Sequence, residues 1–270
     1  MPGLKKLFLN GLLDRFPTNT KQRLAGILSK YATILAESGF CSLAEFDLNG
    51  EEQILKNRPV PLLRAIDGGA NKGDWSSILL DTNPGIESFV MVEPNPGLGK
   101  HLKGRFGSDP RITILNKALD YRQDTLAFSY TSDDDEHATL GSQYMPEVSN
   151  EATTVPTTTV DDILDGLDWP SVDLLKLDLE GFDYFAMLGA RDAFASNRVS
   201  MVQFEVTRSW EDTGASPCAA FRFLEGYGFQ LYHIREDGLH PLPLGMPHFS
   251  IYSNFLGIHR SAGKAQVDHA

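Results

Sequence analysis

The sequence predicts an α/β fold with a parallel sheet, preceded by an N-terminal helical extension. Two observations carry this prediction. From residue 60 onward, short apolar runs alternate with segments of helical spacing, the pattern of a parallel sheet covered on both faces. A glycine-rich loop, "DGGANKGD", follows the first apolar run, and acidic or amide residues end the next runs. In such a sheet a ligand binds beyond the carboxyl ends of the strands.

Each expected strand is an apolar run bounded by polar residues, Gly or Pro. The strands are expected at residues 61–67, 87–93, 111–116, 172–180, 199–205, 229–235 and 249–258. Helical spacing of apolar residues predicts helices at 73–82, 96–106, 182–194 and 216–227. The order of these segments gives a strand–helix alternation over most of the chain.

Three further segments surround this alternation. Residues 1–59 are expected to form a helical extension with a hairpin, because Asn49-Gly50 in "FDLNGEEQIL" is a hairpin signal. Residues 60–260 form the main domain, and residues 261–270 are expected to be a flexible tail. Within the main domain, residues 121–160 are polar, and we interpret them as a lid-like insertion over the site, with disorder as the alternative.

Composition restricts the function classes. The chain has 270 residues and a formal net charge of -12, without a Lys/Arg cluster, which argues against a nucleic-acid partner. Two cysteines are too few for a disulfide framework. No run approaches the roughly 18 apolar residues of a membrane span, so no integral membrane contact is expected. We expect a cytoplasmic protein, and self-association into a homo-oligomer stays open.

The glycine loop predicts the kind of ligand. Gly68, Gly69 and Gly73 do not have the G-x-G-x-x-G spacing of dinucleotide sites. Asp67 directly precedes them, and its carboxylate would repel a diphosphate but suits a ligand with an ammonium group. S-adenosylmethionine carries an ammonium, a sulfonium and no phosphate, and glycines let the main chain approach it closely.

Two more strand ends fit this ligand. Glu93 ends the second strand, where an acid can accept hydrogen bonds from both ribose hydroxyls. Asn116 ends the third, where its side-chain amide can contact adenine. The alternative is a tight turn with solvated acids.

Five stretches carry a resemblance to a known family. They are "AIDGGANKGDWS", "FVMVEPNP", "ITILNKALD", "TTTVDDIL" and "VDLLKLDLEGFDYFAMLGA", which span roughly residues 62–205. In this order they resemble the FkbM family of S-adenosylmethionine-dependent methyltransferases. The resemblance implies a class I (Rossmann-like) methyltransferase domain with a seven-stranded sheet whose last strand is antiparallel. It also implies O-methyl transfer, often to hydroxyls of sugars or polyketides.

The resemblance implies roles for individual residues. Asp67, Gly69 and Asn71 would hold the methionine part of the cofactor, Glu93 the ribose, and Asn95 the same rim. Asn116 and Ala118 would flank adenine. The full expected cofactor set is Asp67, Gly68, Gly69, Asn71, Gly73, Glu93, Asn95, Asn116, Ala118 and Asp178. Where the family has "DxEGxE", this sequence has Asp183 as the final acid, which keeps the charge on a shorter side chain.

Acids near the expected methyl position are the candidate catalytic groups. Lys176, Asp178 and Glu180 alternate with leucines, and Glu205 ends the neighbouring strand. A carboxylate there can remove the proton of an alcohol nucleophile. Asp178 is the first candidate, followed by Glu205, Glu180 and His137 of the insertion.

Other readings of these acids stay open. Lys176 and Asp178 can form a structural ion pair, and Glu180 can cap the next helix. A metal held by these acids is possible in principle, although no metal site is expected.

The sequence therefore predicts an O-methyltransferase that moves a methyl group from S-adenosylmethionine to a hydroxyl of a small-molecule or glycan acceptor, a sugar or related natural product. One alternative is a non-catalytic nucleoside-binding scaffold. Others are a methyltransferase with a peptide or other non-sugar acceptor, and a nicotinamide oxidoreductase, which Asp67 and the glycine spacing oppose.

Overall fold

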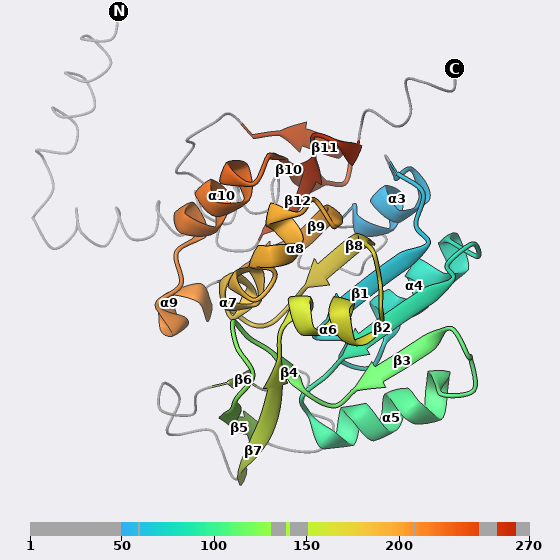
Figure 1. Cartoon of the computed structure of the whole chain (residues 1–270), viewed down its shortest axis with the longest axis vertical. Helices are drawn as coiled ribbons and strands as arrows, with labels where there is room; N and C mark the ends of the chain where they lie inside the picture. The colour runs from blue at the N-terminus through green and yellow to red at the C-terminus, as the bar shows by residue number, and fades with distance from the viewer. Residues whose placement is uncertain are drawn as a thin grey trace, which may run out of the picture.

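The computed structural model describes residues 50–58, 60–130, 139–140, 151–207, 209–242 and 253–262. Within these residues, eight strands form a sheet in the order β11-β10-β12-β9-β8-β1-β2-β3 (Figure 1). Their bounds are β1 Arg64–Gly68, β2 Ser88–Val92, β3 Ile112–Leu115, β8 Val172–Leu177, β9 Val199–Val206, β10 Phe229–Arg235, β11 Gly238–Pro241 and β12 Ser253–His259.

The expected class I methyltransferase sheet is confirmed in its arrangement. Strands β3, β2, β1, β8 and β9 pair in parallel, and β12 lies antiparallel between β9 and β10. The sequence predicted seven of these strands. The eighth, β11, pairs with β10 at the edge as a short antiparallel hairpin.

Two groups of helices cover the sheet. Helices α3 (Glu51–Lys56), α4 (Asp74–Thr82) and α5 (Pro96–Phe106) pack on one face through residues such as Leu55, Leu79 and Leu102. The opposite face is covered by α6 (Val160–Gly166), α7 (Asp183–Leu188), α8 (Arg191–Ala195), α9 (Ser209–Thr213) and α10 (Pro217–Gly226). Alternate residues of each strand point into the two cores, as in a sheet buried on both faces.

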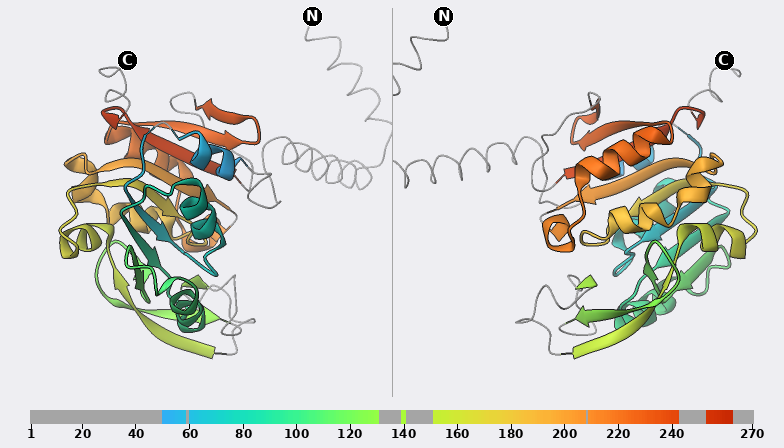
Figure 2. Two further views of the ribbon diagram at one scale, coloured as in Figure 1. Left: turned by 90° about the vertical axis from the view of Figure 1, so that its right-hand side faces the viewer. Right: turned by 60° about the vertical axis from the view of Figure 1, so that its left-hand side comes forward.

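The predicted insertion contributes three strands to a second, smaller sheet, and the fourth strand lies just before residue 121. Its strands are β4 (Ala118–Leu119), β7 (Glu151–Thr158), β5 (Thr125–Tyr130) and β6 (Thr139–Leu140), in that order. Figure 2 shows β5 and β7 projecting beyond β3 and away from the main sheet. The described parts of residues 121–160 therefore include strands. That the insertion covers a substrate stays a prediction.

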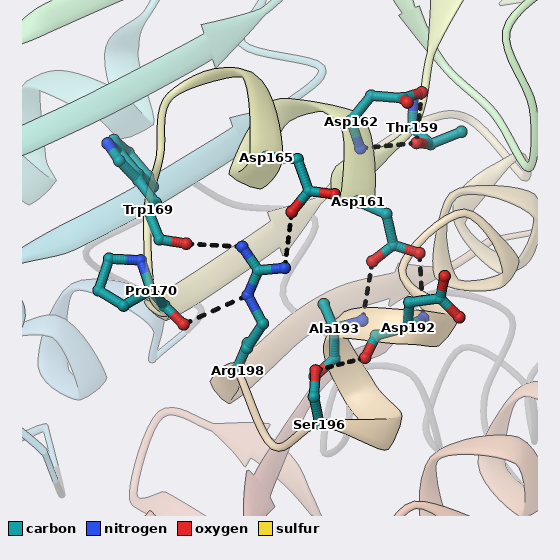
Figure 3. A network of polar contacts seen from close by, with 10 residues as sticks. All are labelled: Thr159, Asp161, Asp162, Asp165, Trp169, Pro170, Asp192, Ala193, Ser196 and Arg198. Atoms are coloured by element: carbon teal, nitrogen blue, oxygen red, sulfur yellow. Dashed lines mark hydrogen bonds and ion pairs between the residues drawn. The ribbon is translucent and has the colours of Figure 1, made fainter.

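The "TTTVDDIL" stretch anchors the face that α6 and α8 cover (Figure 3). Thr159 and Asp162 form a capping box at the start of α6. The carboxylate of Asp161 accepts hydrogen bonds from the N–H groups of Asp192 and Ala193 in the first turn of α8. Arg198 donates to the carbonyls of Trp169 and Pro170 and pairs with Asp165. Together, these contacts hold α6 and α8 beside the amino ends of β8 and β9.

The predicted hairpin at Asn49-Gly50 is wrong. Gly50 has φ 89° and precedes helix α3, which begins at Glu51. A Cβ at Gly50 would lie 2.1 Å from the carbonyl oxygen of Arg235, so the position needs glycine for close packing. Acids in the first turn and Lys56 in the last favour the helix, and burial of Leu55 holds it on the sheet. The rest of the predicted extension, residues 1–49, lies outside the described residues, as do residues 263–270 of the tail.

Two predicted elements end earlier than expected. The strand predicted to reach residue 180 ends at Leu177, and Glu180 has a left-handed φ of 51°. Residues 178–182 form a turn before α7, which we call the acid loop. The predicted helix at 182–194 is two helices, α7 and α8. They separate at Gly189, where a Cβ would lie 2.2 Å from the Asp120 carbonyl oxygen.

Candidate functional site

The glycine loop and the acid loop meet at the carboxyl end of β1 and β8. The N–H of Asp178 donates to the carbonyl of Gly68 at 3.1 Å. Gly69 has φ 76°, and a Cβ built on it would lie 2.0 Å from the carbonyl oxygen of Asp178. Only glycine permits this approach. The sequence-predicted nucleoside loop and the sequence-predicted catalytic acid are therefore in main-chain contact.

Glu93 connects the glycine loop to the loop after β2. Its carboxylate accepts hydrogen bonds from the N–H of Asn71 at 2.9 Å and from the N–H of Asn95 at 2.8 Å. Asn95 in turn accepts from the N–H groups of Gly97 and Leu98 as the N-cap of α5. Burial raises the pKa of Glu93 to about 7, although both main-chain hydrogen bonds lower it.

Asn116 also contacts the loop after β2. Its side-chain nitrogen donates to the carbonyls of Glu93, Pro94 and Asn95 at 2.7, 3.2 and 3.3 Å. Ala118 is buried in β4, one residue before Leu119, whose side chain packs against Gly68. In this arrangement the Asn116 amide holds the loop after β2, and its contact with adenine stays a prediction.

Asp67 lies beneath the glycine loop and is fully buried at 0% exposure. Its carboxylate accepts from Ser76 Oγ at 2.6 Å and pairs with Lys176 Nζ at 3.2 Å. Lys176 also reaches Asp178 at 3.4 Å and lies over the ring of Trp75. Burial alone would lower the pKa of Lys176, but the neighbouring carboxylates outweigh it and raise that pKa above its ordinary value.

The predicted acids lie on two elements, the acid loop and β9. In the acid loop, the side chain of Asp178 is 39% exposed, and the carboxylate of Glu180 accepts a hydrogen bond from Ser209 Oγ at 3.2 Å. Glu180 does not cap α7, because the N-cap position is Phe182, without a side-chain capping bond. Glu205, near the end of β9, is half-buried; burial and the acids around it raise its pKa to about 9. His137 lies outside the described residues.

Four polar residues that the sequence interpretation missed lie near these acids. One is Ser76, which donates a hydrogen bond to Asp67. The other three, Glu51, Gln203 and Asn254, are joined by hydrogen bonds. Glu51 of α3 accepts from Gln203 at 2.7 Å and from Asn254 at 3.0 Å. Gln203 and Asn254 are polar residues inside apolar strands, a signal that was present in the sequence. Glu51 gave no such signal, because its contact depends on how α3 packs.

The comparisons identify the domain. A family model described as "Methyltransferase FkbM domain" matches residues 67–231, more than half of the chain. The chain belongs to the FkbM methyltransferase family. The matched FkbM domain runs from Asp67 of the glycine loop to Leu231 in β10, and it includes the acid loop and Glu205. No curated protein was found to match.

Solved structures resemble this FkbM domain protein at low identity. Methyltransferase FkbM from Methylobacillus flagellatus KT has 16% identity and a TM-score of 0.45, with 80% of this chain and 45% of that chain covered. The precorrin-6y C5,15-methyltransferase from Geobacter metallireducens GS-15 has 12% identity and a TM-score of 0.42, covering 77% and 87%. A SAM-dependent O-methyltransferase from Thermotoga maritima has 14% identity and a TM-score of 0.39, covering 77% and 63%.

Two further observations concern the described residues. None of their His, Cys, Asp and Glu side chains form a group of three or more arranged to hold a metal ion. In the same part of the chain, every helix is too short or too polar to cross a membrane.

Proposed function

We propose that this protein is an O-methyltransferase that moves a methyl group from S-adenosylmethionine to a hydroxyl of a sugar or related natural product. One observation carries the proposal: the glycine loop and the acid loop touch at the Gly69–Asp178 contact. This contact brings the proposed base, Asp178, next to the loop that we propose receives the sulfur nucleoside. Membership of the FkbM family supports the methyl-transfer chemistry.

The cofactor set divides into main-chain and side-chain parts. We propose that the loop of Gly68, Gly69 and Gly73 receives the methionine tail; within the protein, the absent side chains allow close packing against Leu119, the Asp178 carbonyl and the Phe106 ring. Asn71 and Asn95 shape the rim, and Asn116 and Ala118 support the adenine side. Because the carboxylate of Asp67 is engaged by Ser76 and Lys176, we propose that Asp67 fixes the loop from beneath.

Asp178 is the proposed general base. Methyl transfer is an in-line displacement, so the protein mainly aligns the reactants and excludes water. The pair with Lys176 orients the Asp178 side chain, while its 39% exposure leaves it open to an acceptor hydroxyl. Glu205, with a pKa of about 9, holds its proton near neutral pH and is therefore the weaker candidate for this step.

A labelled-methyl experiment tests the function. The protein is incubated with S-adenosylmethionine carrying an isotopically labelled methyl group and a panel of sugars and hydroxylated natural products. We expect a product with one labelled methyl on oxygen, identified by mass and fragmentation. A label found on nitrogen or carbon would contradict O-methyl transfer.

Glu93 gives a prediction for cofactor affinity. Replacing Glu93 by Gln is expected to weaken binding of S-adenosylhomocysteine by about 1.5–3 kcal/mol, the range for a hydrogen bond to a charged group. Since the pKa of Glu93 is about 7, wild-type affinity should fall as the pH drops below 7, up to about tenfold per unit, because the neutral acid is a poorer acceptor.

Calorimetry between pH 5.5 and 8 measures both effects. The Glu93→Gln variant should lose this pH dependence, and Glu87→Gln, on an exposed side chain just before β2, is the matched control. Equal affinities of wild type and Glu93→Gln at pH 8 would show that the ribose lies elsewhere.

A further inference from the structure

Residues 69–74 of the glycine loop form a tight turn between β1 and α4. Asn71 has a left-handed φ of 51°, and Gly69 and Gly73 have φ values of 76° and 82°. The N–H of Gly73 donates to the carbonyl of Ala70 at 2.8 Å, which closes the turn. A left-handed φ is uncommon for a residue with a side chain, and it persists where surrounding contacts hold the main chain in place.

The first half of the loop is held from β2 and the residue after it. The N–H groups of Gly69 and Ala70 both donate to the carbonyl of Val92, at 2.9 and 3.1 Å. The carboxylate of Glu93 accepts from the N–H of Asn71 at 2.9 Å. These contacts fix the loop as far as Asn71, and the residues after it are held from a different element.

The second half of the loop is held by Arg105, in the last turn of α5. Its Nη1 donates to the carbonyl of Lys72 and to the carboxylate of Asp74, both at 2.7 Å. Its Nη2 donates to Ser77 Oγ, also at 2.7 Å. One planar guanidinium with several donors therefore connects the loop to the start of α4.

Phe106 adds an apolar contact to the same half of the loop. A Cβ built on Gly73 would lie 2.5 Å from the Phe106 ring, so this ring packs closely on the main chain. The guanidinium of Arg105 lies over the Phe106 ring, 5.0 Å from its centroid, a cation–π arrangement that favours this position of both side chains. The last turn of α5 is therefore the second support of the glycine loop.

We propose that Arg105 is a positioning residue for the cofactor, because it keeps the glycine loop in the conformation that receives S-adenosylmethionine. The inference rests on the proposed function, in which this loop holds the methionine part. A loop that is in the receiving conformation for only a fraction of the time binds with an affinity reduced by that fraction. The alternative is an ordinary surface ion pair between α5 and α4, which would leave ligand affinity unchanged.

The Arg105→Met variant of the full-length protein tests the proposal, with S-adenosylhomocysteine as the probe. We expect its dissociation constant to rise about tenfold, which corresponds to a loop that is competent for about a tenth of the time. The melting temperature without ligand should stay near wild type, because the lost ion pair is exposed, with Arg105 at 35% and Asp74 at 64%. Calorimetry should show a less favourable binding entropy, since the ligand must then order the loop.

Arg111→Met is the matched control. Arg111 is 37% exposed, pairs with Asp109 at 2.6 Å and donates to the carbonyl of Ile86 at 3.2 Å. This variant loses an ion pair and a carbonyl contact of the same kind without touching the glycine loop, so its affinity for S-adenosylhomocysteine should equal that of wild type. Arg105→Lys keeps the charge but not the planar set of donors, so its affinity should lie between wild type and Arg105→Met.

Hydrogen exchange of the ligand-free proteins measures the loop itself. The amide of Gly73 closes the turn, so it should exchange faster in Arg105→Met than in wild type or Arg111→Met. Wild-type affinity in Arg105→Met, or an equal loss of affinity in Arg111→Met, would overturn the inference and leave the proposed function standing. A wild-type protein that does not bind S-adenosylhomocysteine would overturn the proposed cofactor and this inference together.

Discussion

Replacing Asp178 by Asn is expected to lower methyl transfer by about 10²–10⁴-fold, the usual effect of removing a general base. The amide keeps the volume of the side chain but cannot accept the hydroxyl proton. The fold should persist, because Lys176 keeps its contact with Asp67. Affinity for S-adenosylhomocysteine should also stay close to wild type, since the glycine loop meets the main chain of Asp178 and not its carboxylate.

Single-turnover measurement with labelled cofactor, together with thermal melting, separates the outcomes. Asp81→Asn on the exposed face of α4 is the control, with no expected change. Near wild-type turnover of Asp178→Asn would move the base to another residue, with Glu205 and His137 as the remaining candidates. Loss of cofactor binding would make Asp178 a structural or cofactor-binding residue.

Replacing Lys176 by Met is expected to destabilise the fold by about 3–5 kcal/mol. The change leaves Asp67 fully buried without its cation, and an uncompensated buried charge is costly. Chemical denaturation measures this loss. For a domain of this size it corresponds to a fall in Tm of roughly 10 °C.

A double variant identifies the cause. Asp67→Asn combined with Lys176→Met removes both charges and should recover most of the lost stability, because neither partner is then left charged. Lys103→Met, on an exposed position of α5, controls for the loss of a lysine as such. A double variant as unstable as the sum of the single ones would show that the two side chains act independently.

Local signals in the sequence were sufficient for much of the fold. Helix α5 was predicted at residues 96–106 and has those bounds, because Asn95 caps it and Pro96 occupies its first position. The location of Asp67, Glu93 and Asp178 at one edge of the sheet was also predicted from the sequence alone. All three come at or just after the end of a parallel strand, so they had to lie on the same side of the sheet.

The parts that sequence did not predict depend on contacts between distant segments. Lys176 was paired with its near neighbour Asp178, but its closer partner is Asp67, which lies opposite it in the β1–β8 register. The end of β8 at Leu177 depends on the acid loop packing against Gly69. Helix α3 looked like a hairpin because Asn-Gly is a strong local signal. Its packing against α4 and the sheet decided otherwise.

The central claim is that the loop of Gly68, Gly69 and Gly73 receives a sulfur nucleoside without phosphate. Isothermal titration of the wild-type protein with S-adenosylhomocysteine, and in parallel with NAD, tests it most directly. We predict binding of S-adenosylhomocysteine in the micromolar range and no heat from NAD, because the loop lacks the G-x-G-x-x-G spacing of dinucleotide sites. Binding of NAD, without a response to S-adenosylhomocysteine, would contradict the account.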